Sequence, residues 1–331
     1  MRLGLFLNFE HGEESNLAAF QRQIDLAEKA EQFGLDELWV SEHHFSSFTQ
    51  SGSTLAIMAH LAGRTSRIRI GAAAILLPLH NPIRLAEDLA TIDILSRGRL
   101  DLGLARGGPF PTQYAHFHIE PDEARARSDE AAELLLRLLT DESVNFKGRW
   151  HVCEGLTVYP RLVQPKLPVW VASADKDTVA RASRRGFGLM AGHAASQALI
   201  GGLRDVYREA SGARDPDVVI LRNVCVADTD AAAHKAALPA LERFYERMRE
   251  HSGRPAGPMS LDGALAAGLI GSPETCRAKL EELKAAVPVS SLVLKIACLD
   301  PAMAVETLRR FRSEVAPAGT EVAGAPIVSR G

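Results

Sequence analysis

The sequence has few cysteines and no long apolar run. Its four cysteines, Cys153, Cys225, Cys276 and Cys298, are widely spaced without a C-x-x-C pair, which argues against a zinc site or a disulfide framework and fits a reducing compartment. No stretch approaches the roughly 20 apolar residues needed to cross a bilayer, and the opening MRLGLFLNFEHGEESN lacks a small-residue cleavage site. We therefore expect a cytoplasmic protein that does not enter a membrane.

An excess of charge of one sign is also missing. The chain carries 38 Lys and Arg against 41 Asp and Glu, a formal net charge of -3, and has no basic run, so neither nucleic acid nor an anionic membrane is an expected partner. Neither G-x-x-x-x-G-K-[ST] nor G-x-G-x-x-G occurs, which excludes a nucleotide P-loop. Small organic molecules remain as the expected ligands.

Apolar runs of strand length are what the sequence does contain. Eight of them alternate with helical patterns, at residues 3–9, 37–40, 68–75, 100–105, 168–172, 188–192, 218–226 and 291–297. This alternation predicts a parallel sheet of the α/β class, and eight buried strands fit a closed (β/α)8 TIM barrel better than an open doubly wound sheet. No linker or repeat divides the chain, so we expect one domain over residues 1–331.

Helix signals and long connections complete the expected barrel. The first helix should bury a stripe made of Leu17, Phe20, Ile24 and Ala27. The last barrel helix should begin with Ser272 as N-cap and Pro273 at its first position. Insertions are predicted after the fourth strand (106–121) and the seventh (228–271), with a small hairpin at 145–152, turning at Lys147 and Gly148; such long connections are often functional lids.

Glu42, His43 and His44 follow the second strand, at the end of a barrel strand where functional groups gather. A metal site is disfavoured, because adjacent residues of an extended chain point to opposite sides and no H-x-x-x-H or C-x-x-C pair supplies further ligands. Two interpretations stay open. Either one histidine packs in the core and the other is solvated, or the histidines serve as acid, base or hydrogen-bonding groups.

Two further strand ends carry features that bind anions. Arg106 follows the fourth strand and precedes two glycines, which let a ligand approach the backbone. The segment VASADKDTVARA after the fifth strand places Ser173 and Thr178 at the start of a helix, whose free amide groups attract phosphate. Together, on one face of the barrel, they predict a site for a phosphorylated ligand.

These residues resemble the bacterial luciferase-like flavin-dependent monooxygenase family, most closely its alpha-subunit type. The resemblance covers nearly the whole chain. It rests on LFLNF, ELWVSEHHF, the segment from Ile70 to Gly107, and GSPETC.

The resemblance implies a barrel that binds reduced FMN (FMNH2), which reacts with O2 to a C4a-peroxyflavin that oxygenates a small organic substrate. It also implies a separate flavin reductase, a homodimer and no metal. His43 matches the catalytic histidine. The implied cofactor-binding positions are Ala73, Ala74, Arg106, Gly107, Ser173, Ala174, Thr178 and Gly192. The implied substrate-lining positions are Asn8, Glu42, His44, Ala105, Phe110 and His193. The peptide bond between Ala73 and Ala74 is expected to be cis, within a bulge.

Departures from the family pattern keep the substrate open. Ala105 replaces a reactive cysteine, and Thr112 or Gln113 stands near the place of an aspartate. We therefore expect oxygenation of a carbonyl compound or a secondary metabolite rather than light emission from a long-chain aldehyde. Two alternatives remain: an F420-dependent oxidoreductase of the same superfamily, whose second strand usually ends in S-D-H-F, and a non-catalytic flavin-binding subunit, which lacks the paired histidines.

Overall fold

The fold is a closed parallel barrel, described by a computed structural model for residues 1–108, 111–252 and 261–317. Within these residues, eight strands follow one another around the barrel, and β11 pairs with β1 to close it. The strands, in spatial order, are β1 (Arg2–Leu7), β2 (Glu37–Val40), β3 (Arg69–Leu76), β4 (Leu100–Ala105), β7 (Val169–Ala172), β8 (Gly188–Ala191), β9 (Val218–Val226) and β11 (Ser291–Ile296). The predicted (β/α)8 fold is confirmed.

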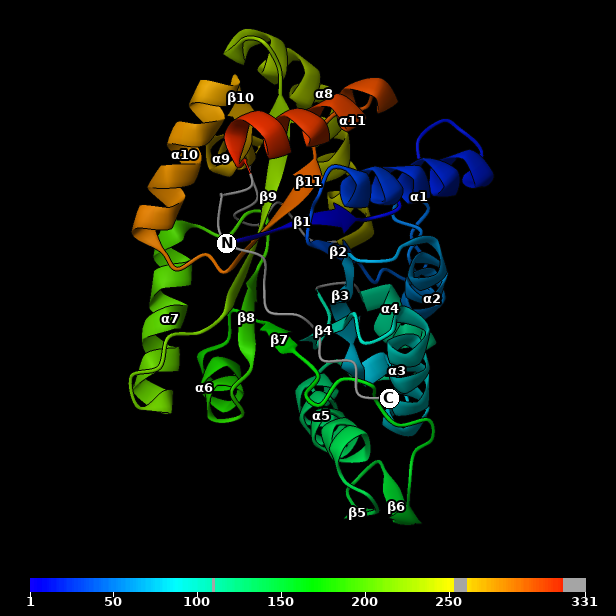
Figure 1. The fold of residues 1–331 in the computed structure, drawn as a ribbon. Coiled ribbons are helices and arrows are strands. Elements are labelled where there is room, and N and C mark those ends of the chain that lie inside the picture. The colour runs from blue at the N-terminus through cyan, green and yellow to red at the C-terminus, as the bar shows by residue number, and fades with distance from the viewer. Residues whose placement is uncertain (109–110, 253–260, 318–331) are drawn as a thin grey trace, which may run out of the picture.

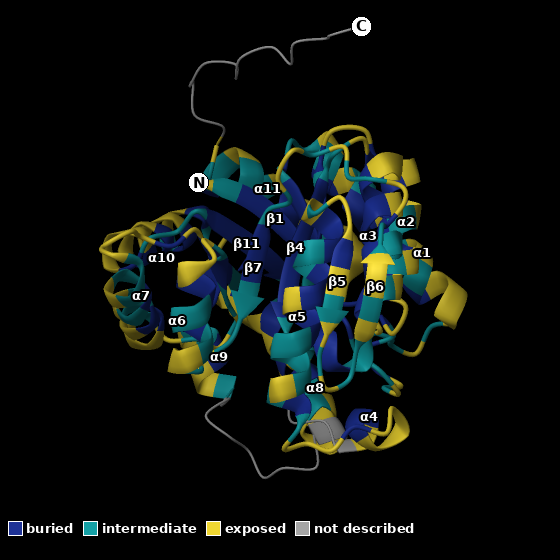
Figure 2. Cartoon of the chain, turned by 90° about the horizontal axis from the view of Figure 1, so that it is seen from below, coloured by how far each residue is buried: buried dark blue, intermediate teal, exposed yellow. Residues whose placement is uncertain are grey.

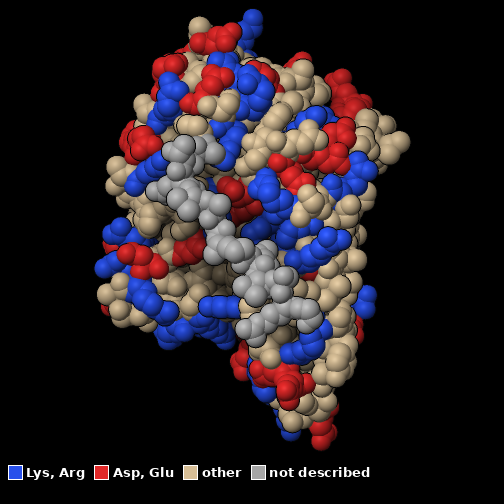
Figure 3. All heavy atoms as spheres, in the orientation of Figure 1, with Lys and Arg blue, Asp and Glu red and all other residues tan. Residues whose placement is uncertain are grey.

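Helices surround the strands, with α1 to α3 on one side and α6, α7 and α10 on the other (Figure 1). They are α1 (Asn16–Gln32), α2 (Thr54–Arg64), α3 (Pro82–Ser96), α5 (Ala124–Thr140), α6 (Lys176–Arg184), α7 (Gln197–Ser211), α10 (Pro273–Ala286) and α11 (Pro301–Arg310), the last continuing into a π turn, η2 (Phe311–Val315). Most of the barrel strands are buried and the outer helix faces are exposed (Figure 2). On the face in Figure 3, acidic and basic side chains are interspersed.

The barrel interior is filled by two tryptophans lying against glycines. Trp39 and Trp170 meet edge to face, with ring centroids 5.4 Å apart. A Cβ on Gly71 would lie 2.5 Å from the Trp39 ring, and one on Gly188 would lie 2.2 Å from Trp170 Cδ1. Glycine at these positions therefore makes room for the indoles, which fill the lower barrel and leave the C-terminal ends of the strands to form the site.

The two predicted insertions are present and contain structure of their own. The first holds one short helix among its described residues, α4 (Pro111–His116). The second holds α8 (Asp230–Ser252), α9 (Leu261–Ala267) and an unpredicted strand, β10 (Leu269–Gly271), which pairs with the last residues of β9. A short 3-10 turn, η1 (Leu77–Leu79), follows β3. The predicted hairpin is present but longer than expected, with β5 (Val144–Lys147) paired to β6 (Val152–Leu156). Its turn lies between Gly148 and His151 rather than at Lys147 and Gly148. Within the described residues, no helix is long and apolar enough to span a bilayer.

The two helix predictions had different outcomes. Ser272 caps α10 by accepting from the Thr275 N–H, with Pro273 in the first turn, as predicted. The stripe predicted for α1 was wrong at Leu17, which is 78% exposed. The residues buried in that helix are Ala19, Gln23, Leu26, Ala27 and Ala30. Small side chains let α1 lie close to the barrel, and its first turn extends past the packed surface.

Candidate functional site

A buried carboxylate holds two imidazoles at the C-terminal end of β2. The Glu42 side chain accepts hydrogen bonds on one oxygen, Oε1, from Nε2 of His44 and from Nε2 of His80, both at 2.8 Å. Its other oxygen, Oε2, accepts from the Leu76 N–H at 3.1 Å. Glu42 is therefore an orienting group, and it fixes two histidine rings relative to the ends of β2 and β3.

The surroundings of Glu42 keep it ionised. Burial by itself raises the pKa of the carboxyl, but the hydrogen bonds from His44 and His80, the charge of His80 and the Leu76 N–H outweigh it and lower the pKa to about 2. Because the folded-state pKa lies below the usual value of 4.5, the network stabilises the fold fully above pH ~4.5, and this stabilisation is lost as the pH falls towards 2.

Glu42→Gln is expected to remove this pH dependence. At pH 7 the variant should lose on the order of 3 kcal/mol of unfolding free energy, the equivalent of the lowered pKa, and the loss should shrink as the pH falls below ~4.5. Urea unfolding of parent and variant at several pH values between 3 and 7 measures the difference directly. If the difference in unfolding free energy does not change with pH, Glu42 stabilises the fold by packing rather than by its charge.

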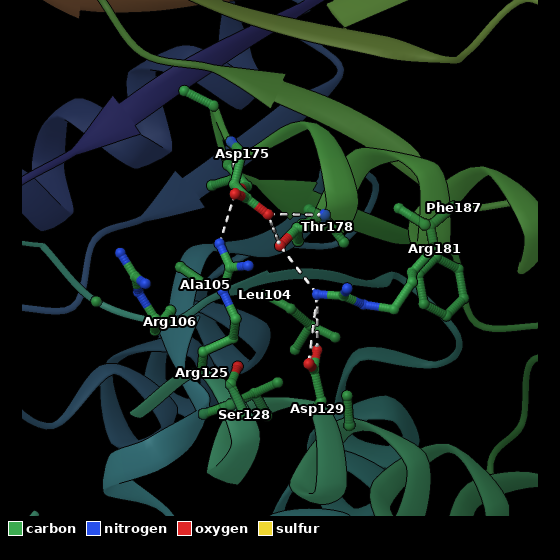
Figure 4. Close-up of a pocket in the computed structure, with 18 of the residues that line it drawn as sticks. Leu104, Ala105, Arg106, Arg125, Ser128, Asp129, Asp175, Thr178, Arg181 and Phe187 are labelled. Atoms are coloured by element: carbon green, nitrogen blue, oxygen red, sulfur yellow. Dashed lines mark hydrogen bonds and ion pairs between the residues drawn. The ribbon is translucent and has the colours of Figure 1, made fainter. Parts of the chain in front are cut away.

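A second set of predicted residues surrounds a cavity of about 300 Å³ beside the ends of β4 and β7, between α5 and α6 (Figure 4). Six of the predicted residues line it: Ala105, Arg106, Gly107, Ser173, Ala174 and Thr178. Gly107 has φ +107°, and a Cβ there would lie 2.8 Å from the Tyr114 hydroxyl oxygen, so only glycine fits this turn without strain. Six residues that the sequence analysis named separately thus lie around one cavity.

The charge of the cavity is strongly positive. Arg125 pairs with Asp175 at 2.5 Å, and Arg181 pairs with Asp129 at 3.3 Å. Two more guanidinium groups, those of Arg106 and Arg185, also line the cavity and are exposed. Neither forms an ion pair with any residue that the structure describes. Two uncompensated cations at one cavity suit a dianion such as a phosphate monoester.

The sequence predicted free backbone amide groups at the start of α6, but one of them is already hydrogen-bonded. Asp175 is the N-cap, and its carboxylate accepts from both the N–H and the hydroxyl of Thr178, at 2.9 and 2.8 Å. Hydrogen bonds from Thr178 and the ion pair with Arg125 lower the pKa of Asp175 to about 2. The Thr178 amide is therefore occupied, and the arginines and the Ser173 hydroxyl carry most of the capacity to bind an anion.

The end of β3 contains the predicted irregularity. The peptide bond between Ala73 and Ala74 is cis, which confirms the prediction, and the pairing with β4 shifts register between Ala72 and Ile75. Ala73 contacts the residues of the barrel interior. The bulge therefore lies at the barrel mouth, one strand away from Arg106.

The remaining predicted residues lie around the mouth but outside the cavity. His43 is half-buried after β2, and Gly192, after β8, accepts from the Arg222 guanidinium at 3.3 Å. His193 packs edge-on against Phe244 of α8, 5.2 Å between centroids. Phe110 lies outside the described residues.

Asn8 is buried and His193 is half-buried, and each has a side-chain atom with unused hydrogen-bonding capacity. Burial, with the charges of Lys295 and Arg222, lowers the pKa of His193 to about 3, so its ring is neutral at physiological pH. Its Nε2 atom and the Oδ1 atom of Asn8 are buried without a hydrogen-bonding partner among the described residues. Polar atoms of this kind are expected where a ligand binds.

Comparison with known proteins identifies the family of the chain. The family model described as luciferase-like monooxygenase matches residues 1–289. The chain belongs to this family.

Three relatives of the luciferase-like family illustrate its range. The oxygenase component of a flavin-dependent trigonelline monooxygenase from Acinetobacter baylyi is 27% identical over 72% of this chain and 68% of its own. An F420-dependent glucose-6-phosphate dehydrogenase from Amycolatopsis mediterranei is 33% identical over 50% of this chain and 52% of its own. The crystal structure of monooxygenase RslO1 from Streptomyces bottropensis superposes with a TM-score of 0.88 at 26% identity, covering 95% and 98% of the chains. Flavin-dependent monooxygenases and F420-dependent enzymes thus share the luciferase-like fold.

Several site residues of this luciferase-like barrel were not predicted. His80 lies within the segment from Ile70 to Gly107 that carries the family resemblance, but the sequence does not indicate that it is a partner of Glu42. Arg125, Asp129 and Arg185 come from helix faces that look like ordinary charged surface in the sequence. The position of Lys295 could have been predicted from the sequence. Alternate residues of a strand point to the same face, and Val293 of β11 packs in the barrel interior. Lys295, two residues later, therefore lies inside the mouth.

Proposed function

We propose that this protein is the oxygenase component of a flavin-dependent monooxygenase that uses reduced FMN and O2 to oxygenate a small organic molecule. The observation that carries the proposal is the pair of guanidinium groups, Arg106 and Arg185, without ion pairs on a cavity at the barrel mouth. A flavin phosphate is the dianion that suits it, and family relatives use flavin. A separate reductase would supply the reduced flavin.

The residues at the mouth would divide the work. Arg106, Arg185 and Ser173 would bind the phosphate, while the backbone bulge at Ala73 would support the flavin ring. Reduced FMN supplies the two electrons with which one atom of O2 enters the substrate while the other leaves as water. His43 would hold or deliver a proton beside the reacting oxygen. The helix α8 carries Phe244 over the mouth and would exclude water.

The test is an anaerobic titration of the protein with reduced FMN and, separately, with reduced F420, followed by mixing with oxygen. We expect reduced FMN to bind and its oxidation by oxygen to pass through a spectrally distinct, slowly decaying phase. Binding of F420 in preference to FMN would favour the F420-dependent alternative. Flavin binding without that slow phase would favour a non-catalytic subunit.

Arg106→Ala is expected to weaken binding of reduced FMN by about 10- to 100-fold, because a charge-assisted hydrogen bond to phosphate contributes roughly 1.5–3 kcal/mol. Equilibrium titration measures the change. Riboflavin, which lacks the phosphate, is the matched control ligand and should bind parent and variant equally. An equal loss for both ligands would place Arg106 at the ring or in the fold rather than at the phosphate.

A further inference from the structure

A second cavity opens into the barrel mouth on the side away from Arg106 and Arg185. It has a volume of about 640 Å³ and lies between α1, α8 and α11, over the ends of β1 and β11. In the strand order, β1 lies opposite β7, and β11 lies opposite β4. The two cavities therefore approach the mouth from opposite sides, and they have no lining residue in common.

The inner end of this cavity is a small polar cluster. The side chain of Lys295 is 5% exposed, and its Nζ lies 3.0 Å from Glu10 Oε1. The same carboxylate oxygen accepts from Asn8 Nδ2 at 2.9 Å. Lys295 also sits 3.5 Å from the centroid of the Phe244 ring on α8. All three polar residues line the cavity, so a ligand entering it meets them directly.

The cluster offers one donor and one acceptor to such a ligand. A carboxylate only accepts hydrogen bonds, so the Asn8 amide must turn its Nδ2 towards Glu10, and Oδ1 is left as an acceptor. Asn8 is 5% exposed, and its Oδ1 has no partner among the described residues. The ammonium group has three N–H bonds, of which Glu10 uses one. A group that can both accept and donate, such as a hydroxyl, matches this pair.

The charge of Lys295 is already balanced by Glu10. An anionic head group would pair with the ammonium but would also lie beside the carboxylate, and a cationic one would be repelled by Lys295. The walls further out contain both apolar and charged side chains. The apolar part includes Leu241, Ile296 and Val305. Among the charged residues, Arg22 pairs with Glu14 at 2.7 Å, and Arg243 donates to the His11 carbonyl. The balanced Lys295–Glu10 pair at the inner end and the aliphatic part of the wall favour a neutral ligand with a mostly apolar body.

We propose that this cavity binds the molecule to be oxygenated, and that this molecule is a neutral, largely apolar alcohol or phenol whose hydroxyl accepts from Lys295 and donates to Asn8 Oδ1. The assignment of the ligand as substrate rests on the proposed function. Binding in the cavity does not, because it needs neither flavin nor oxygen.

The experiment measures binding of three matched probes, 1-octanol, 2-octanone and octanoate, to the flavin-free protein by calorimetry. We expect 1-octanol to bind most tightly, 2-octanone several-fold more weakly and octanoate at least tenfold more weakly than 1-octanol. Asn8→Leu should abolish the preference for the alcohol over the ketone. Glu10→Gln should raise octanoate affinity by roughly tenfold or more, because it leaves Lys295 as an uncompensated cation.

Filling the cavity provides the positional control. Ala304→Leu on α11 and Ala240→Leu on α8 each place a larger side chain in the lining and should weaken all three probes at least tenfold. Ala302→Leu, at an exposed position of the same helix as Ala304, should change none of them. Thermal unfolding checks that each variant is folded, and either filling variant suffices if the other does not fold.

Three outcomes would overturn the proposal. Octanoate binding most tightly to the parent would make this an anion site. If Ala304→Leu or Ala240→Leu folds and still binds the probes as tightly as the parent does, the probes bind elsewhere on the protein. No binding of any probe, in protein that still binds reduced FMN, would remove the cavity as a ligand site while leaving the proposed monooxygenase function intact.

Discussion

Replacing His43 by alanine is expected to lower the product formed per reduced FMN by roughly 100-fold or more, the usual scale for a positioned acid or base. The residue lies shortly after the end of β2 at Val40, next to Glu42, whose lowered pKa keeps it ionised. Because Glu42 fixes the rings of His44 and His80, the fold and the binding of reduced FMN should change little. Product yield, hydrogen peroxide release and FMN affinity are measured on the same preparation.

His60→Ala is the matched control for the loss of an imidazole, since His60 is exposed on α2. Its product yield should equal that of the parent. If His43→Ala also leaves both the yield and the peroxide release unchanged, His43 has a structural role, and the acid or base must be sought elsewhere at the mouth.

Alanine at Gly71 is expected to destabilise the barrel by about 1–3 kcal/mol, the typical cost of overpacking a core. The added Cβ would lie 2.5 Å from two carbons of the Trp39 ring. Trp39 is fully buried and meets Trp170 edge to face, so it has little space to move into. Urea unfolding followed by tryptophan fluorescence measures the change in unfolding free energy.

The same substitution elsewhere should have the opposite sign. Gly63 lies in α2 with nothing within 4 Å of an added Cβ, so Gly63→Ala should stabilise by roughly 0.5–1 kcal/mol. In a Trp39→Leu background, alanine at Gly71 should cost less than in the parent, because the clashing ring is gone. An equal cost in both backgrounds would show that Trp39 is not what excludes a side chain at Gly71.

The strands could be predicted because a parallel barrel buries each of them on both faces. Residues such as Leu3, Leu5 and Leu7 of β1 pack against the helices, and this leaves a continuous apolar signal in the sequence. The strand β10 could not be predicted this way. It has three residues, too few for a periodic pattern, and it exists because the long β9 extends beyond β8 and offers it a free edge.

The residues of the candidate site could be predicted only where a polar or charged side chain comes directly after a strand in the sequence. Arg106 and Ser173 satisfy that condition and meet at one cavity. Arg125 does not, because it comes from α5 and reaches Asp175 across 50 positions of sequence. The role of Asp175 itself was missed because an N-cap acid and a free helix start look alike until the side-chain torsion is known.

The separation of the two cavities bears on how such a protein can diversify. Because they share no lining residue and reach the mouth from opposite sides, substitutions in one should combine additively with substitutions in the other. A mutational library confined to α1, α8 and α11 would change the lining of the cavity around Lys295. The arginines that surround the other cavity would stay in place. A single barrel could therefore keep one cavity unchanged while substitutions in the other change which substrates it binds.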